Sequence, residues 1–498
     1  MLNGKLSIDP AFTVAPVNRR LFGSFVEHMG RCVYGGIYEP GHPTSDDSGL
    51  RGDVLELVRE LGVTAVRYPG GNFVSGYKWE DGVGPVDRRP TRRDPAWKTI
   101  ETNAFGLNEF MHWARRADVE PIMAVNLGTR GMSEALELLE YANHPHGTEL
   151  SDRRVEHGAK EPHNIRMWCL GNEMDGPWQL GHKSADAYGR LAAATGRALH
   201  QFDPGLELVA CGSSHRQMPT FGAWEATVLE HAYDEVDFIS AHAYYENQGD
   251  LAGFLASSVN MDAFIADVVA SADYVRARLN KSKRTFISFD EWNVWYMSRV
   301  PGQVRSWRPT PRISEEAYTL ADAVVVGSML ITLLRHSDRV TSACLAQLVN
   351  TIAPIRTEPG GAAWRQATFH PFALTARYAR GDVLRVEPVT PLVPTQMYGD
   401  VPMIDATATR DPASGETTLF VVNRHTQDPV RLEVSTTALG PVVVEEASAL
   451  TDPDPAAVNS ERDPQRVVPA PLEVVAHEGT LTLELPAVSW ACVRLRTS

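Results

Sequence analysis

The stretch "IRMWCLGNE" (165–173) is a mainly apolar run that ends in two adjacent polar residues, Asn172 and Glu173. A short apolar run of this kind is typical of a strand in a parallel sheet that is buried on both faces. A polar side chain buried beside it is unfavourable unless something pairs with it. We therefore expect the amide and the carboxylate at the carboxyl end of a buried strand, facing a polar mouth where a ligand can bind.

Seven further segments of the same type occur between about residue 20 and residue 380. They are 21–28, 63–71, 120–128, 206–214, 236–245, 284–292 and 341–349. Amphipathic helical stretches such as "SADAYGRLAAATGRALHQF" (184–202) separate them. Eight such alternating units over this length predict an α/β fold of the (β/α)8 TIM-barrel type. An open doubly wound sheet is the rival, but no GxGxxG motif follows an early strand.

The pattern changes near residue 380, where short alternating strands such as "TTLFVVNRH" (417–425) replace the helical stretches. Gly, Pro and Asp punctuate these strands, which is typical of an antiparallel β-sandwich, here expected to be jelly-roll-like. The first residues form a strand and turn that could join this sandwich. The predicted domains are therefore 1–17, joining the sandwich, a catalytic barrel over 18–383, and a C-terminal sandwich over 384–498.

The formal net charge is −15, with no basic block beyond "RRPTRR" (88–93). Nucleic acids and anionic membranes bind clustered Lys and Arg, so neither is an expected partner. We interpret the 88–93 run as a solvated loop. The most apolar segment, "ADAVVVGSMLITLLRH" (321–336), is too short to span a membrane.

The five cysteines are widely separated, and none forms a CxxC pair. This spacing favours reduced, mostly buried thiols in a reducing compartment. The N-terminal "MLNGKLSIDPAF" (1–12) has no signal-like apolar stretch. We therefore expect a cytoplasmic protein.

Polar residues stand at the carboxyl end of nearly every predicted strand, which is where a (β/α)8 barrel builds its active site. They are Glu27, His28, Arg67, Asn126, Asn172, Glu173, Ser213, Ser214, His215, His242, Tyr244, Asp290, Glu291, Trp292 and Gln347. Any one of them has a simple structural interpretation, such as an ion pair or a buried hydrogen bond. Their convergence at one pole of the barrel is what predicts a site.

Three carboxylates in this ring, Glu27, Glu173 and Glu291, suit the cleavage of a glycosidic bond. That reaction uses one protonated and one ionised carboxyl group on either side of the sugar. Aromatic residues able to stack on sugars are expected nearby: Trp79, Trp97, Trp178, Trp292, Trp295 and Tyr244. A catalytic metal held by the histidines and acids is the competing interpretation. No HxH or HExxH motif stands at a strand end, so we expect neither a metal nor a cofactor.

Five long motifs resemble the α-L-arabinofuranosidases of glycoside hydrolase family 51. They are "FGSFVEHMGRCVYGGIYEP" (22–40), "RYPGGNFVSGYKWEDGVGP" (67–85), "GNEMDGPWQ" (171–179), "FDEWNVWY" (289–296) and "QLVNTIAPI" (347–355). The resemblance runs through essentially the whole chain, and it implies a retaining glycosidase with a (β/α)8 barrel.

The resemblance also implies a role for individual residues. Glu173 matches the general acid/base of the family, and Glu291 matches its nucleophile. The other matched positions are Glu27, Asn72, Asn172 and Gln347 for the furanose hydroxyls, Tyr244 for positioning the nucleophile, Arg67 and His242 for supporting the carboxylates, and Trp97 and Trp295 as walls of the subsites. A retaining mechanism predicts carboxyl groups about 5–5.5 Å apart.

The implied activity is exo-acting release of terminal non-reducing α-L-arabinofuranosyl residues from arabinoxylan or arabinan oligosaccharides by double displacement. The resemblance also implies a homo-oligomer, a hexamer. Two alternatives stay open from the residues. One is an endo-β-glucanase or β-xylosidase on the same scaffold. The other is a carbohydrate-binding protein without catalytic activity.

Overall fold

The eight apolar segments form a closed barrel of parallel strands in the computed structural model, which describes residues 2–304 and 307–497. The barrel order is β10-β11-β12-β3-β4-β7-β8-β9, so strands consecutive along the chain are neighbours and the last pairs with the first. The strands are β3 (Gly23–Phe25), β4 (Ala65–Tyr68), β7 (Glu120–Ala124), β8 (Met167–Leu170), β9 (Glu207–Ala210), β10 (Phe238–Tyr245), β11 (Phe286–Val294) and β12 (Val340–Ala346). The predicted (β/α)8 barrel is confirmed.

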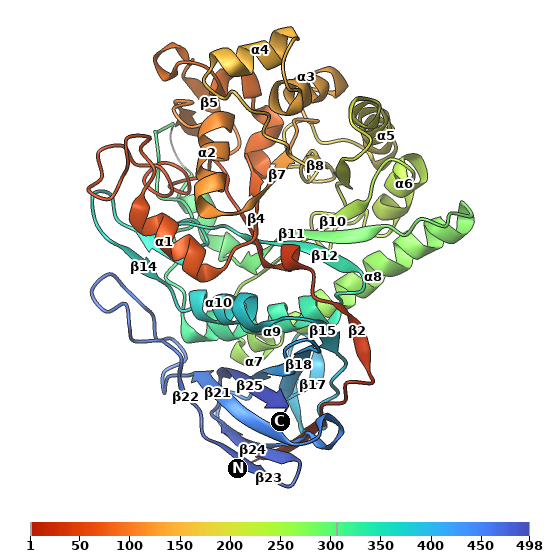
Figure 1. The fold of residues 1–498 in the computed structure, drawn as a ribbon, viewed down its shortest axis with the longest axis vertical. Helices are drawn as coiled ribbons and strands as arrows, with labels where there is room; N and C mark the ends of the chain where they lie inside the picture. Colours follow the sequence, from red (N-terminus) through yellow and green to blue (C-terminus); the bar gives the residue numbers. More distant parts are fainter. Residues whose placement is uncertain (1, 305–306, 498) are drawn as a thin grey trace.

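Helices alternate with the barrel strands and surround them (Figure 1). They are α1 (Gly52–Leu61), α2 (Leu107–Ala117), α3 (Met132–Asn143), α4 (Glu149–Glu156), α5 (Ala185–Phe202), α6 (Ala223–Ala232), α7 (Leu251–Leu255), α8 (Ser257–Arg278), α9 (Leu320–Arg335) and α10 (Phe369–Tyr378). Sequence signals set their ends: the Ser184 side chain caps the start of α5, and Gly62 takes a left-handed conformation (φ 77°) after α1.

Two sheets pack against each other to form the C-terminal sandwich. The smaller has the order β1-β20-β24-β23, with β1 (Leu2–Ser7), β20 (Val430–Ser435), β24 (Thr480–Leu485) and β23 (Val474–His477). The larger has the order β2-β15-β18-β19-β25-β21-β22, with β2 (Thr13–Pro16), β15 (Asp382–Leu384), β18 (Ile404–Asp411), β19 (Glu416–Asn423), β25 (Ser489–Thr497), β21 (Val442–Leu450) and β22 (Ala470–Pro471). The ladders are antiparallel except for β1 with β20, which run parallel.

The predicted domain limits at 17/18 and 383/384 stay predictions, and Met1 and Ser498 lie outside the described residues. Three two-stranded hairpins complete the strands. They are β5 (Arg92–Asp94) with β6 (Thr99–Glu101), β13 (Ile355–Thr357) with β14 (Ala363–Arg365), and β16 (Leu392–Thr395) with β17 (Gly399–Pro402).

The helix α9 joins the two domains, and Figure 1 shows α9 and α10 between the barrel and the sandwich. Its residues 320–334 are buried, which explains why the 321–336 segment is so apolar. Gly327 lets α9 approach the sandwich closely, because a Cβ there would lie 2.2 Å from the ring of Trp490. Below it, buried Asp405 of β18 pairs with Arg335 and with Arg424, the latter at 2.7 Å.

The cysteines are all buried and free, as expected from their spacing. Within the predicted solvated run 88–93, Arg89 pairs with Glu109 and Arg92 pairs with Asp81. Across residues 2–304 and 307–497, none of the helices is both long enough and apolar enough to cross a membrane.

Candidate active site

A cavity of about 750 Å³ opens at the carboxyl ends of the barrel strands. Its lining contains eight of the predicted site residues: Glu27, Asn72, Trp97, Glu173, Tyr244, Glu291, Trp295 and Gln347. The remaining three, Arg67, Asn172 and His242, are almost fully buried and hydrogen-bonded to the carboxylates or to one another. The barrel therefore brings these eleven residues to one pole.

Glu291 lies near the end of β11 and is held by two donors. Arg67, on β4, donates to its Oε1 at 2.8 Å, and the Tyr244 hydroxyl, on β10, donates to its Oε2 at 2.8 Å. The second guanidinium nitrogen of Arg67 donates to Asn172 at 2.7 Å. Such charge-assisted bonds stabilise an ionised carboxylate and fix its orientation.

Glu173 follows β8 and reaches the same cavity. Its backbone φ of 44° lies in the left-handed region, which L-residues seldom enter. His242 lies 2.9 Å from its Oε1, and the indole of Trp178 donates to its Oε2 at 2.6 Å. Burial raises the pKa of Glu173, the hydrogen bond with His242 lowers it, and the charge of Glu291 raises it again, so that the pKa lies above its usual value. A carboxyl group of this kind keeps its proton to a higher pH than an exposed one.

His242 connects the two carboxylates to a third acid. Its Nε2 lies 2.9 Å from Asp290, on β11, and its Nδ1 lies 3.6 Å from Glu291 Oε2. Burial opposes protonation of the ring, but the charges of Glu291, Asp290 and Glu173 outweigh it and raise the pKa of His242 well above its usual value. Burial by itself would raise the pKa of Asp290, but Arg67 and His242 together bring it below its usual value. These carboxylates therefore favour the protonated ring, in which both nitrogens can donate.

Glu27 lies across the cavity and accepts three hydrogen bonds. The donors are the backbone N–H of Phe73 at 2.9 Å, the indole of Trp97 at 2.9 Å and the amide of Gln347 at 3.1 Å. Burial, and then the charge of Glu291, raise the pKa of Glu27 to about 8 despite these donors. At neutral pH much of Glu27 therefore carries a proton and can donate one hydrogen bond to a ligand.

Two neighbouring tryptophans line the cavity. The rings of Trp97 and Trp295 are 6.5 Å apart, and Trp295 meets the ring of Tyr244 edge-on at 4.9 Å. Trp97 comes from the β5–β6 hairpin, where buried Asp94 accepts its backbone N–H at 3.0 Å. The aromatic walls and the polar floor together suit a ligand with hydroxyl groups and apolar faces.

Comparison with known proteins agrees with this geometry. The family described as "Alpha-L-arabinofuranosidase 1 domain" matches residues 57–254, and "Alpha-L-arabinofuranosidase C-terminal domain" matches 290–489. The intracellular exo-α-(1→5)-L-arabinofuranosidase of Streptomyces lividans is 58% identical over 500 residues, which cover 99% of this chain and 75% of that protein. The exo-α-(1→6)-L-arabinofuranosidase of Bifidobacterium longum is 52% identical, with 99% and 97% covered.

A solved structure extends the agreement to three dimensions. A family 51 α-L-arabinofuranosidase from Bifidobacterium longum superposes with a TM-score of 0.96 at 49% identity, over 99% of both chains. The chain belongs to glycoside hydrolase family 51. Its members include exo-acting enzymes named for different linkages, so family membership leaves the linkage of this chain open.

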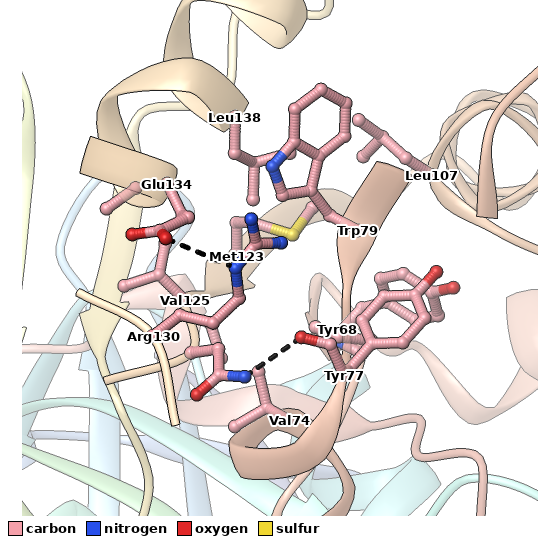
Figure 2. A pocket seen from close by; sticks show the side chains of 14 residues that line it. Tyr68, Val74, Tyr77, Trp79, Leu107, Met123, Val125, Arg130, Glu134 and Leu138 are labelled. Carbon is pink, nitrogen blue, oxygen red and sulfur yellow. Dashed lines mark hydrogen bonds and ion pairs between the residues drawn. The ribbon is translucent and has the colours of Figure 1, made fainter. Parts of the chain in front are cut away.

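Some of the predicted polar and aromatic residues do not line the cavity of this family 51 chain. Trp79 and Asn126 line a separate small pocket between β7 and the surrounding helices, shown in Figure 2. There the Asn126 amide donates to the Tyr77 carbonyl at 2.9 Å. Trp292 is fully buried in the barrel core, so its expected stacking role is wrong. Both ring nitrogens of His28 are hydrogen-bonded within the protein, Nδ1 to Glu101 and Nε2 to the Tyr68 hydroxyl, each at 2.9 Å.

Two contacts within the family 51 site were not assigned from the sequence. Trp178 was expected to stack on a sugar or line a cleft; it does line the cavity, and its N–H also donates to Glu173. Asp290 was in the polar ring without a role, and it anchors His242. Their position within or beside the motifs of Glu173 and Glu291 was the available signal, yet a contact between residues 48 apart, such as His242 and Asp290, depends on the barrel register.

A metal ion is a poor fit to the family 51 site. Single ligand atoms of Glu173, His242 and Glu291 do lie within 4.8 Å of one another. However, a histidine binds metal through a neutral, unprotonated nitrogen. Both nitrogens of His242 face carboxylates, and those charges favour its protonated form.

Proposed function

We propose that the chain is a retaining, exo-acting α-L-arabinofuranosidase in which Glu291 is the nucleophile and Glu173 the general acid/base. The observation that supports this most is the approach of their carboxylate oxygens to within 4.8 Å in one cavity. Retaining glycosidases place the two carboxyl groups about 5–5.5 Å apart, whereas inverting enzymes need about 6.5–9.5 Å to hold a water between them.

In the first step Glu291 Oε2 or Oε1 forms a bond to the anomeric carbon while the bond from that carbon to the glycosidic oxygen breaks. Glu173 gives its proton to the departing oxygen. The raised pKa of Glu173 favours the protonated form that this step requires. Arg67 and Tyr244 orient the ionised Glu291 for attack. The product is an arabinosyl-enzyme ester with inverted configuration.

In the second step Glu173, now ionised, takes a proton from water, and the water oxygen bonds to the anomeric carbon. The ester bond to Glu291 breaks, and the second inversion restores the original configuration. The imidazolium of His242 lies beside both carboxylates and offsets negative charge as the proton moves. Glu27, Asn72, Asn172 and Gln347 would bind the furanose hydroxyls, and Trp97 and Trp295 would form the walls.

The natural substrates we propose are short oligosaccharides of arabinan or arabinoxylan, attacked at terminal arabinofuranosyl residues. The names of the relatives, exo-acting and in one case intracellular, support exo action on such fragments in the cytoplasm. A homo-hexamer is also part of the proposal, and it is carried only by the family resemblance.

The test compares Glu173→Ala and Glu291→Ala on aryl α-L-arabinofuranosides with good and poor leaving groups. Glu173→Ala should lose about 10²–10⁴-fold in kcat/KM on the poor leaving group and far less on the good one, because the bond to a good leaving group breaks with little acid assistance. Base assistance to water in the second step is lost with both substrates. Azide should restore its turnover and give the α-configured azide, since azide replaces water in the second step. Glu291→Ala should be nearly inactive on every substrate.

Glu446→Ala, on the half-buried outer strand β21, is the matched control and should keep the wild-type rate. Wild-type rates in both active-site variants would refute the assignment. Hydrolysis of an aryl xyloside or glucoside in preference to the arabinofuranoside would instead favour a β-xylosidase or an endo-β-glucanase. No hydrolysis at all, with sugar binding retained, would favour a binding protein.

A further inference from the structure

A second cavity of about 410 Å³ adjoins the active-site cavity at the junction of the barrel and the sandwich. We call it the junction pocket. The two cavities share four lining residues, His215, Gln217, Tyr244 and Met297. A ligand that extends from the active site past these side chains therefore enters the junction pocket.

The sandwich supplies one wall of this pocket. The turn of the β16–β17 hairpin contributes Met397 and Tyr398, opposite Met297 of the barrel. The hairpin is held in place by the barrel, because the backbone N–H of Gln396 donates to Asp250 at 3.3 Å, just before α7. Met397 is 64% exposed, so the pocket opens to solvent beside it.

The charged side chains Arg216 and Glu246 of the junction pocket already have hydrogen-bond partners in the protein. Arg216 bonds Asp267 at 2.7 Å. Glu246 accepts from the backbone N–H and the hydroxyl of Ser298, at 3.3 and 3.1 Å. An ionic ligand would have to compete with these internal partners. The arrangement therefore favours an uncharged occupant.

The rest of the lining combines neutral polar groups with aromatic rings. The Tyr245 hydroxyl donates to Asn260 Oδ1 at 3.1 Å, which leaves the amide N–H groups of Asn260 without a protein acceptor among the described residues. Tyr398, Tyr245 and Phe264 supply ring surface. Hydroxyl and amide groups beside aromatic faces are the surroundings that an uncharged sugar needs, since sugars have both hydroxyl groups and apolar C–H faces.

The direction of the leaving group connects the two cavities. If Glu173 protonates the departing oxygen, the remainder of the substrate lies on its side of the cavity. Trp178 bonds Glu173, and the ring of Trp178 stacks on His215 at 6.1 Å, which borders the junction pocket. We propose that the junction pocket is a subsite for an uncharged sugar residue of the aglycone, one unit beyond the residue attached to the scissile bond. This proposal rests on the proposed function.

The test measures kcat/KM for an aryl arabinofuranoside, a linear α-1,5-arabinobiose and the corresponding triose. The wild type should prefer the triose to the biose, because only the triose reaches the junction pocket. Tyr398→Ala and Asn260→Ala should lower the triose-to-biose ratio about 3- to 10-fold, the effect of one or two lost contacts. Tyr274→Ala, at a 58%-exposed position on α8 that does not line the pocket, should leave the ratio unchanged.

Asn260 and Tyr398 lie in different domains, so if one variant fails to fold, the other still tests the proposal. Tyr398→Phe, which keeps the ring, is a third variant for the same comparison. Equal kcat/KM for triose and biose in the wild type, or an unchanged ratio in folded Tyr398→Ala and Asn260→Ala, would overturn the subsite. Absence of aryl arabinofuranoside hydrolysis in the wild type would instead overturn the proposed function.

Discussion

Tyr244→Phe removes a single oxygen atom from the site and leaves the ring against Trp295. That oxygen donates to Glu291 Oε2 at 2.8 Å, and the next donor to this carboxylate oxygen, His242 Nδ1, is 3.6 Å away. Arg67 would still hold Oε1. The variant therefore keeps the charge balance of the site but loses the hydrogen bond that orients one oxygen of Glu291, the proposed nucleophile.

A hydrogen bond to a charged group contributes about 1.5–3 kcal/mol. If it is needed in the transition state, its loss lowers kcat by about 10- to 100-fold. The assay is the steady-state rate on an aryl arabinofuranoside, with KM and the thermal midpoint measured on the same preparations. Because the bond orients Glu291 and contacts no leaving group, we expect the loss mainly in kcat.

Tyr233→Phe is the matched control, since this buried hydroxyl donates to the Lys283 carbonyl at 3.1 Å, away from the active-site cavity. It should change stability slightly and leave kcat alone. A folded Tyr244→Phe enzyme with kcat within twofold of wild type would refute the proposed positioning of Glu291 by Tyr244. A rise in KM with unchanged kcat would show that Tyr244 acts only in substrate binding.

Three further predictions follow from the same contacts. Trp178→Phe removes the N–H that favours the ionised form of Glu173, so the pKa of Glu173 should rise. The alkaline limb of the plot of kcat/KM against pH should then move to higher pH; a limb that stays in place or moves to lower pH contradicts this. The pKa of Glu27 is about 8 in the folded protein and has its ordinary value in the unfolded chain. Between pH 5 and 8 only the unfolded state releases this proton, which lowers the free energy of unfolding by about 4 kcal/mol. Glu27→Gln should flatten the plot of urea-derived unfolding free energy against pH over this range, and an equally steep plot would be inconsistent with the raised pKa. Asp405→Asn removes the carboxylate charge that pairs with buried Arg424 and with half-buried Arg335, of which Arg335 keeps Asp262 as a partner. The loss should lower the free energy of unfolding by about 3–5 kcal/mol, mainly through Arg424, while kcat/KM on the aryl substrate stays constant; a stability equal to that of the Asp411→Asn control would exclude a structural role for this cluster.

The sequence alone determined the architecture of this protein. Apolar strands that alternate with amphipathic helices can bury both faces only in a covered parallel sheet, and the eight repeats predicted its closure into a barrel. The same logic placed Glu173 and Glu291 at one pole, because the carboxyl ends of parallel strands all meet there. Periodicity and strand direction are local properties, so they can be interpreted without coordinates.

Only the tertiary structure decided which of these polar residues touch. His242 bonds Asp290 and Glu173, and Trp178 bonds Glu173 rather than simply standing beside it. Trp79 and Trp292 were expected near the site, as Trp295 was, but Trp79 lines a separate small pocket and Trp292 packs in the barrel core. The junction pocket likewise joins strand β10 to a hairpin about 150 residues later in the chain. Such contacts depend on barrel register, side-chain direction and domain docking, which arise from packing of the whole chain and leave no periodic trace in the sequence.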